Sequence, residues 1–222
     1  MQRIPEPELM EDEGQARAYA LADFEEPHNR FVELFRDSFP GLDVNGHVLD
    51  LGCGPGDISI RFARAFPHCM IHGVDGSKAM LKFGVELLAK APEVIGRVQL
   101  LLGYLPDASL PRRQYDIIIS NSLLHHLAEP KVMWQTVRLH ADAETPVFIM
   151  DLMRPQSVEM AATLVEKNAA GEPEILRRDF YKSLLAAYQI DEVREQLKDE
   201  GLTALDVRAV SDRHLVVSGL LE

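Results

Sequence analysis

The stretch Val48-Leu49-Asp50-Leu51-Gly52-Cys53-Gly54-Pro55-Gly56-Asp57 decides how the rest of the chain is interpreted. It begins as a run of apolar residues, which is typical of a buried parallel strand. Alternating glycines follow, and residues 58–66 then repeat apolar side chains at helical spacing. The pattern predicts a strand, a tight glycine turn and a helix. Glycine allows a ligand close to the backbone and a helix N-terminus offers unpaired N–H groups, so this turn is a candidate nucleotide site.

The spacing of the glycines distinguishes two classes of nucleotide binder. The dinucleotide fingerprint places its third glycine three residues after the second, where this chain has Asp57. The glycines here run G-x-G-x-G, with Asp50 at the strand end. The stretch resembles motif I of the class I S-adenosylmethionine (SAM)-dependent methyltransferases. A second stretch, from Tyr115 to Leu127, resembles motif IV of the same family.

The resemblance implies an α/β fold with a Rossmann-like, doubly wound, seven-stranded sheet. Most of its strands are parallel, a C-terminal antiparallel hairpin closes it, and helical lid segments are added. Residues 1–44 are predicted to form an extended N-terminal arm and a helical lid, whose helices break near Pro27. Residues 45–222 are predicted to form the SAM-binding domain, with a helical insertion at about 155–186.

The resemblance also implies the cofactor, SAM, with S-adenosyl-L-homocysteine (SAH) as product. Asp75 follows the second strand roughly 20 residues after the glycine turn, where an acid accepts ribose hydroxyls; capping of the next helix is the alternative. Tyr104 replaces the aspartate with which relatives bind adenine, and Tyr19 is either a lid residue or a core-packing tyrosine. The predicted cofactor-binding residues are Asp50, Gly52, Cys53, Gly54, Gly56, Asp75, Gly76, Met80, Gly103, Tyr104, Asn121, Ser122 and Tyr19.

Methyl transfer from SAM is an in-line displacement, so the resemblance implies an enzyme that holds its acceptor close to the methyl group. His125 is the predicted general base, because a neutral imidazole is available near pH 7, and Asp151 is the second catalytic candidate. His126 is assigned a structural role. No metal is expected, because no third ligand at suitable spacing accompanies the two histidines.

A small-molecule acceptor is the predicted substrate, and helices within 155–186 are predicted to cover it. Arg154, Arg177 and Arg178 favour a polar or anionic acceptor, although a solvated helix face explains the last two equally well. The alternatives are a methyltransferase acting on RNA or protein, and a protein that binds SAM without methyl transfer.

The composition indicates which classes of partner and which location to expect. The formal net charge of −12 disfavours a protein that grips nucleic acid through phosphate contacts. The two cysteines are too few for a disulfide framework and favour a cytoplasmic location. No apolar run reaches the length of a membrane span. The sequence leaves the oligomeric state open.

Overall fold

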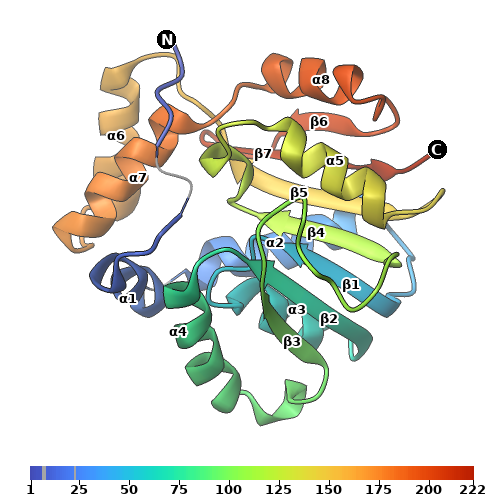
Figure 1. Cartoon of the computed structure of the whole chain (residues 1–222). Coiled ribbons are helices and arrows are strands. Elements are labelled where there is room, and N and C mark those ends of the chain that lie inside the picture. The colour runs from blue at the N-terminus through green and yellow to red at the C-terminus, as the bar shows by residue number, and fades with distance from the viewer. Residues whose placement is uncertain (7–8, 23) are drawn as a thin grey trace.

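The computed structural model describes residues 1–6, 9–22 and 24–222. Its centre is a seven-stranded sheet in the order β3-β2-β1-β4-β5-β7-β6, drawn in Figure 1. The strands β1 to β5 pair in parallel, and β7 pairs antiparallel with both β5 and β6. The predicted fold is therefore confirmed. The strands are β1 (Asn45–Leu51), β2 (His68–Asp75), β3 (Val98–Leu102), β4 (Ile117–Asn121), β5 (Pro146–Leu152), β6 (Asp206–Ala209) and β7 (His214–Leu220).

Helices cover both faces of this sheet (Figure 1). The helices of the described residues are α1 (Glu13–Leu21), α2 (Glu25–Ser38), α3 (Asp57–Ala65), α4 (Lys78–Ala89), η1 (Pro92–Val94), η2 (Leu124–His126), α5 (Lys131–His140), α6 (Val158–Ala169), α7 (Glu174–Ala186) and α8 (Ile190–Asp199). One apolar core lies between the sheet and α2 with α3, and a second lies between the sheet and α5 with α8. Such two-sided burial explains why the central strands are almost wholly apolar.

Successive side chains of each strand point to opposite faces, so one strand serves both cores. Val48 belongs to the core under α2 and α3, whereas its neighbour Leu49 belongs to the core under α5 and α8. Trp134 is fully buried in the second core. The side chains of the strands therefore fill both cores, and the edge at which the parallel strands end remains available for a binding site.

A third apolar cluster joins α6 and α7 to the end of β5. These helices stand beside the sheet rather than on one of its faces (Figure 1). The N-terminal arm runs along them, with the backbone N–H of Ile4 donating to the carbonyl of Leu185 at 3.0 Å. The arm then leads to α1, which packs against α4 and α7. This side group therefore covers the region in front of the carboxyl ends of the strands.

One boundary in the lid differs from the prediction. The chain leaves α1 at Leu21, and α2 starts at Glu25, so Pro27 lies in the first turn of α2 and breaks nothing. Proline is tolerated there because the N–H groups of a first helical turn have no intrahelical partner. Within the described ranges, no helix has the length and apolar character needed to cross a membrane.

Candidate active site

A large cavity opens at the carboxyl ends of the central strands. The strand order reverses between β1 and β4, and open α/β sheets bind ligands at such a switch point. The cavity measures about 970 Å³ and is lined by the glycine turn, the ends of β2 and β4, α1, α2 and α7. Ligand pockets usually span about 300 to 1,000 Å³. This cavity is therefore large enough for a cofactor together with an acceptor.

The three glycines of the turn have different surroundings. All three adopt positive φ, at 67° for Gly52, 54° for Gly54 and 78° for Gly56. A Cβ added to Gly52 would collide with Leu123 at 2.7 Å, and one added to Gly56 would press on Leu100 at 3.1 Å. A Cβ on Gly54 would meet only the terminal methyl of Met80, at 3.9 Å. Gly54 therefore presents bare backbone to the open cavity.

Asp75 ties this turn to the next one. One oxygen of its carboxylate accepts the backbone N–H of Gly54 at 2.8 Å, and the other accepts that of Ser77 at 2.7 Å. Ser77, not Asp75, caps α4, because its hydroxyl accepts the N–H of Met80. Burial raises the pKa of Asp75, although both backbone donors pull it down. The carboxylate lines the cavity with room on its remaining lone pairs.

Asp50 is buried behind the turn. It accepts a hydrogen bond of 2.5 Å from the hydroxyl of Ser59, on α3. Burial raises the pKa of Asp50 to about 7, the Ser59 hydroxyl opposes this, and the nearby Asp75 carboxylate adds to it. Asp50 therefore holds a proton more readily than an exposed aspartate does, and Asp75 lies closer to the open cavity.

His125 and Asp151 form a buried pair at the other end of the cavity. Both side chains are about 2% exposed, and Nδ1 of His125 lies 2.6 Å from Oδ1 of Asp151. Asp151 also accepts the backbone N–H groups of Leu124 and Leu152, so its carboxylate is fixed from two sides. Asp151 therefore holds Nδ1 of the imidazole as the donor and leaves Nε2 as the basic nitrogen.

The N-terminal arm reaches this pair. Oε1 of Glu6 lies 3.7 Å from Nε2 of His125 and 3.3 Å from Nδ1 of His126. Burial alone would lower the pKa of His125, but the carboxylates of Asp151 and Glu6 outweigh it and raise that pKa overall. His126 was predicted to be structural; the tight turn of η2 instead places both imidazoles at the cavity, 4.2 Å apart. The rule that neighbouring residues diverge holds for regular elements, and this turn is not one.

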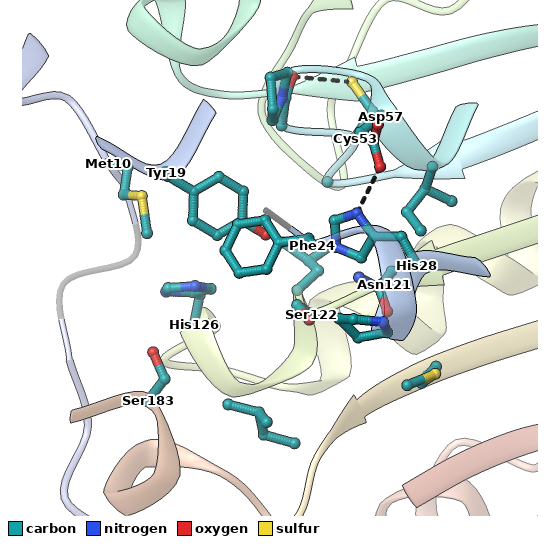
Figure 2. Close-up of a pocket in the computed structure, with 18 of the residues that line it drawn as sticks. Met10, Tyr19, Phe24, His28, Cys53, Asp57, Asn121, Ser122, His126 and Ser183 are labelled. Atoms are coloured by element: carbon teal, nitrogen blue, oxygen red, sulfur yellow. Dashed lines mark hydrogen bonds and ion pairs between the residues drawn. The ribbon is translucent and has the colours of Figure 1, made fainter. Parts of the chain in front are cut away.

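Aromatic rings from the lid form another wall. Figure 2 shows the rings of Tyr19, Phe24 and His28 next to one another. The ring centroids of Tyr19 and Phe24 lie 4.8 Å apart, and those of Phe24 and His28 lie 5.1 Å apart. Nδ1 of His28 lies 2.6 Å from the carboxylate of Asp57. Burial, together with neighbouring carboxylates, raises the pKa of Tyr19 to about 12. Tyr19 therefore lies at the cavity as a neutral phenol.

Most of the residues predicted from the sequence meet at this one cavity. The lining residues among them are Tyr19, Asp50, Gly52, Cys53, Gly54, Asp75, Gly76, Met80, Gly103, Tyr104, Asn121, Ser122 and His125. Gly56 faces Leu100 instead, and Asp151 lies behind His125. The ring of Tyr104 lies over Gly76, where a Cβ would approach it to 3.1 Å.

The three arginines that the sequence analysis placed near an anionic acceptor do not line the cavity. Arg154 is buried and donates to the carbonyl of Ala187 and to Glu192. Arg177 pairs with Glu166 and Arg178 with Asp179, and none of the three arginines lines the cavity. Their surroundings are set by helix packing that the sequence did not show. Among the described lining residues, Arg30 and Arg213 are the only arginines or lysines.

Several residues that line the cavity or hold the N-terminal arm in place could not be predicted from the sequence. Arg3 donates to the carbonyls of His125 and Leu127 and stacks over Tyr188 at 4.1 Å. Phe24 and Ser183 line the cavity. An extended arm has no periodicity, so nothing in its sequence indicates what it packs against. Ser183 lies in the inserted helices, which the sequence did place at the acceptor side.

Comparison with known proteins agrees with this arrangement. Residues 48–140 match the model of a methyltransferase domain family. That match covers both the glycine turn after β1 and the His125 turn after β4, on a sheet of the expected order. The family match therefore falls on the two stretches whose motifs predicted a class I SAM-dependent methyltransferase.

Curated relatives share part of their length with this chain. The trans-aconitate 2-methyltransferase of Mycobacterium tuberculosis is 30% identical over 128 residues, covering 52% of this chain and 44% of the relative. This chain spans less than half the length of the curated relatives that it matches first.

Solved structures share the fold. A SAM-dependent methyltransferase from Aquifex aeolicus aligns over 95% of this chain and 99% of its own, with a TM-score of 0.66 and 18% identity. The plantazolicin methyltransferase BpumL, solved with a substrate analogue and SAH, aligns over 94% and 90%, with a TM-score of 0.70 and 14% identity. At these identities the likeness extends to the fold.

Proposed function

We propose that the protein transfers the methyl group of SAM to a small-molecule acceptor. The observation that carries this proposal is Gly54, whose bare backbone faces the cavity while Asp75 holds its N–H from behind. SAM contains a ribose and an amino-acid group, and both fit this environment. The carboxylate of Asp75 can accept hydrogen bonds from the two ribose hydroxyls, and the glycine turn lets the amino-acid part of the ligand lie close to the backbone. The SAH bound by a neighbour of the same fold supports this choice of cofactor.

In the proposed complex, Asp75 accepts the ribose hydroxyls, and Met80 with Tyr104 flanks the adenine. Asn121, which ends β4, and Ser122, which follows it, face the methionine part. Gly52, Cys53, Gly76 and Gly103 shape the backbone around the ligand, while Asp50 and Gly56 support the turn from within. Tyr19 closes the pocket as part of the lid. All but Gly56 lie at the cavity surface.

The acceptor is proposed to bind between the lid, α7 and His125. The methyl group of SAM is already electrophilic, so the protein contributes mainly proximity and a dry pocket. His125 is the proposed proton acceptor when the acceptor atom must lose a proton, with Nε2 as the basic nitrogen. Asp151 acts as a positioning residue, because its carboxylate fixes the imidazole and does not reach the cavity surface.

The lining supports an uncharged or basic acceptor rather than a polyanion. Among the described lining residues that are not assigned to the cofactor, acidic side chains outnumber the basic ones; they are Glu25, Glu26, Glu33, Asp57, Glu172 and Asp179. A tricarboxylate such as the substrate named for the M. tuberculosis relative would meet like charges here. The acceptor of this protein is therefore proposed to differ from that of the relative.

The test is an assay of SAH release from SAM by mass spectrometry, with a panel of amines, phenols, thiols and carboxylic acids. The proposal expects turnover with members of the uncharged or amine groups. His125→Asn should keep SAM affinity and lower turnover by roughly 10²- to 10⁴-fold, the usual contribution of a general base. Turnover only with polycarboxylates would refute the proposed acceptor class, and SAH release without any acceptor would favour a different SAM reaction.

A further inference from the structure

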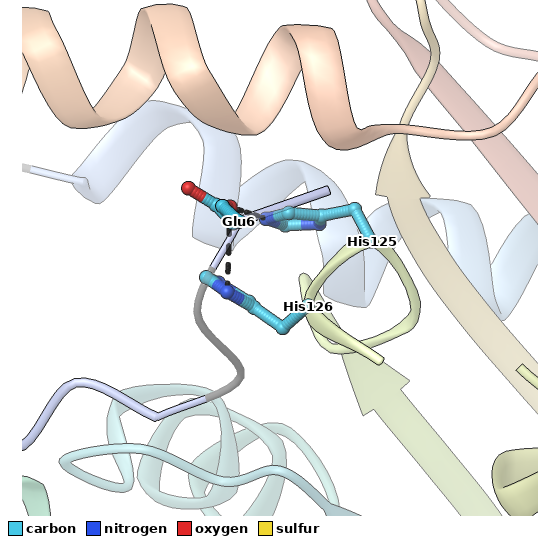
Figure 3. A group of neighbouring side chains, drawn as sticks. All are labelled: Glu6, His125 and His126. Atoms are coloured by element: carbon cyan, nitrogen blue, oxygen red, sulfur yellow. Dashed lines mark ion pairs between the residues drawn. The ribbon is translucent and has the colours of Figure 1, made fainter. Parts of the chain in front are cut away.

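Glu6 lies beside the rings of His125 and His126 and is joined to each by an ion pair, as Figure 3 shows. One carboxylate oxygen of Glu6, Nε2 of His125 and Nδ1 of His126 all lie within 4.8 Å of one another. The carboxylate comes from the N-terminal arm, more than a hundred residues away in the sequence. The missing third ligand, which was the reason to expect no metal, is therefore supplied by a segment with no sequence signal of its own.

The separations within this cluster suit a shared cation better than direct hydrogen bonds. Nδ1 of His126 is 3.3 Å from the Glu6 oxygen, and Nε2 of His125 is 3.7 Å from it. Hydrogen bonds of the N–H···O type span about 2.7 to 3.2 Å. Two ligands on a tetrahedral Zn²⁺, each bonded at about 2.05 Å, lie about 3.3 Å apart. The separation of Glu6 from His126 already matches that value, and its separation from His125 exceeds it by about 0.4 Å.

The groups behind the three ligand atoms provide an independent observation. A metal-bound histidine almost always donates its other ring N–H to a carboxylate or carbonyl. His125 does so through Nδ1, to the buried carboxylate of Asp151 at 2.6 Å. The Glu6 oxygen in turn accepts a hydrogen bond of 2.8 Å from the hydroxyl of Ser183. Two of the three ligand groups are thus oriented in advance.

The arm that brings Glu6 is firmly held. Nη2 of Arg3 donates to the carbonyls of His125 and Leu127 at 2.9 and 3.1 Å, on the backbone side of the same turn. Ile4 bonds to Leu185. Charge favours a cation here, because the carboxylates of Asp151 and Glu6 both act on the imidazole of His125 and Arg3 opposes them. Asp179 and Lys182 also act on Glu6, with opposite signs.

We propose that Glu6, His125 and His126 bind one divalent transition-metal cation, of which Zn²⁺ fits best. Two imidazoles and one carboxylate are the ligand set of catalytic zinc sites, in which a fourth position stays open. That position faces the cavity, which both histidines and Ser183 line. An acceptor oxygen or water bound there would lose its proton more easily. Nε2 of His125 cannot bind the cation and take a proton at once, so the cation would replace the imidazole as the activating group.

The experiment is a titration of the chelator-stripped full-length protein with Zn²⁺ alone, followed by calorimetry against a competing chelator. Co²⁺ serves as a second probe, since its visible absorption reports tetrahedral coordination. One Zn²⁺ should bind per chain. Glu6→Gln and His126→Asn should each weaken binding at least about tenfold, and Asp151→Asn should weaken it by roughly 10- to 100-fold. Mg²⁺ should not compete, because it prefers oxygen ligands.

The matched control is His28→Asn. His28 has its own carboxylate partner, Asp57 at 2.6 Å, and lines the same cavity, yet it lies outside the three-ligand cluster. Its loss should leave Zn²⁺ affinity unchanged. Melting curves will show that Glu6→Gln and His126→Asn are folded, and SAM affinity measured on the same samples separates this proposal from the one on function. Absence of stoichiometric binding, or binding kept in both variants, would overturn the site and leave a protonated imidazole beside Glu6.

Discussion

Replacing Gly54 by alanine tests the cofactor site with a single methyl group. The added Cβ meets only Met80, at 3.9 Å, so the protein without ligand has room for it. The φ of 54° is the remaining cost to folding, about 1 to 2 kcal/mol for a side chain in the left-handed region. In the complex, the methyl group takes space that the ligand needs. Overpacking costs about 1 to 3 kcal/mol, so SAM affinity should fall by roughly 5- to 150-fold.

Gly96→Ala is the matched control. Gly96 also has positive φ, at 84°, and no atom lies within 4 Å of its added Cβ, but it lies in an exposed turn before β3. Both variants should lose similar stability in urea unfolding, while only Gly54→Ala should bind SAM and SAH more weakly by calorimetry. Equal SAM affinity in the two variants would refute the argument that the ligand lies against Gly54.

Three further outcomes are expected. Asp75→Ala should weaken SAM by on the order of 2 kcal/mol and also lower the melting temperature without ligand, because it leaves two backbone N–H groups unpaired; calorimetry showing full affinity would contradict the ribose role. Asp50, with its pKa raised from 3.8 to about 7, makes the native state lose stability as pH rises between these values. Asp50→Asn should remove this pH dependence of the free energy of unfolding, and the variant should gain at most about 4 kcal/mol relative to the parent protein at pH 8. Urea unfolding at several pH values that shows the same pH dependence in both proteins would contradict this. Arg154→Ala should cost about 2 to 3 kcal/mol, whereas Arg177→Ala, on the surface, should cost less than about 1 kcal/mol; an acceptor KM altered by either would show that the arginine contacts substrate after all.

The sheet and the cofactor side could be predicted because their chemistry is local. The apolar run before Gly52 defines β1, and the glycine spacing and Asp75 follow from it at fixed distances along the chain. A parallel sheet then brings the ends of β1, β2 and β4 to one edge. His125 was predicted for the same reason, since it directly follows β4.

The acceptor side could not be predicted because it depends on long-range packing. Arg154 follows β5, as the sequence suggested, but it turns inward to Glu192 and the carbonyl of Ala187. Glu6 belongs to an arm that has no secondary structure, and its position is fixed by bonds to α7 and to the turn at His125. No periodicity or motif specifies such contacts, so the third member of the histidine cluster became visible only in the structure.

The most direct test of the central claim is a crystal structure of the full-length protein with SAH. The account predicts one SAH in the cavity at the switch point, with its ribose hydroxyls on the Asp75 carboxylate and its chain against Gly54. Its sulfur should face the chamber bounded by His125 and α7. An SAH bound elsewhere, or a cavity without SAH at saturating concentration, would contradict the proposal that this protein is a SAM-dependent enzyme.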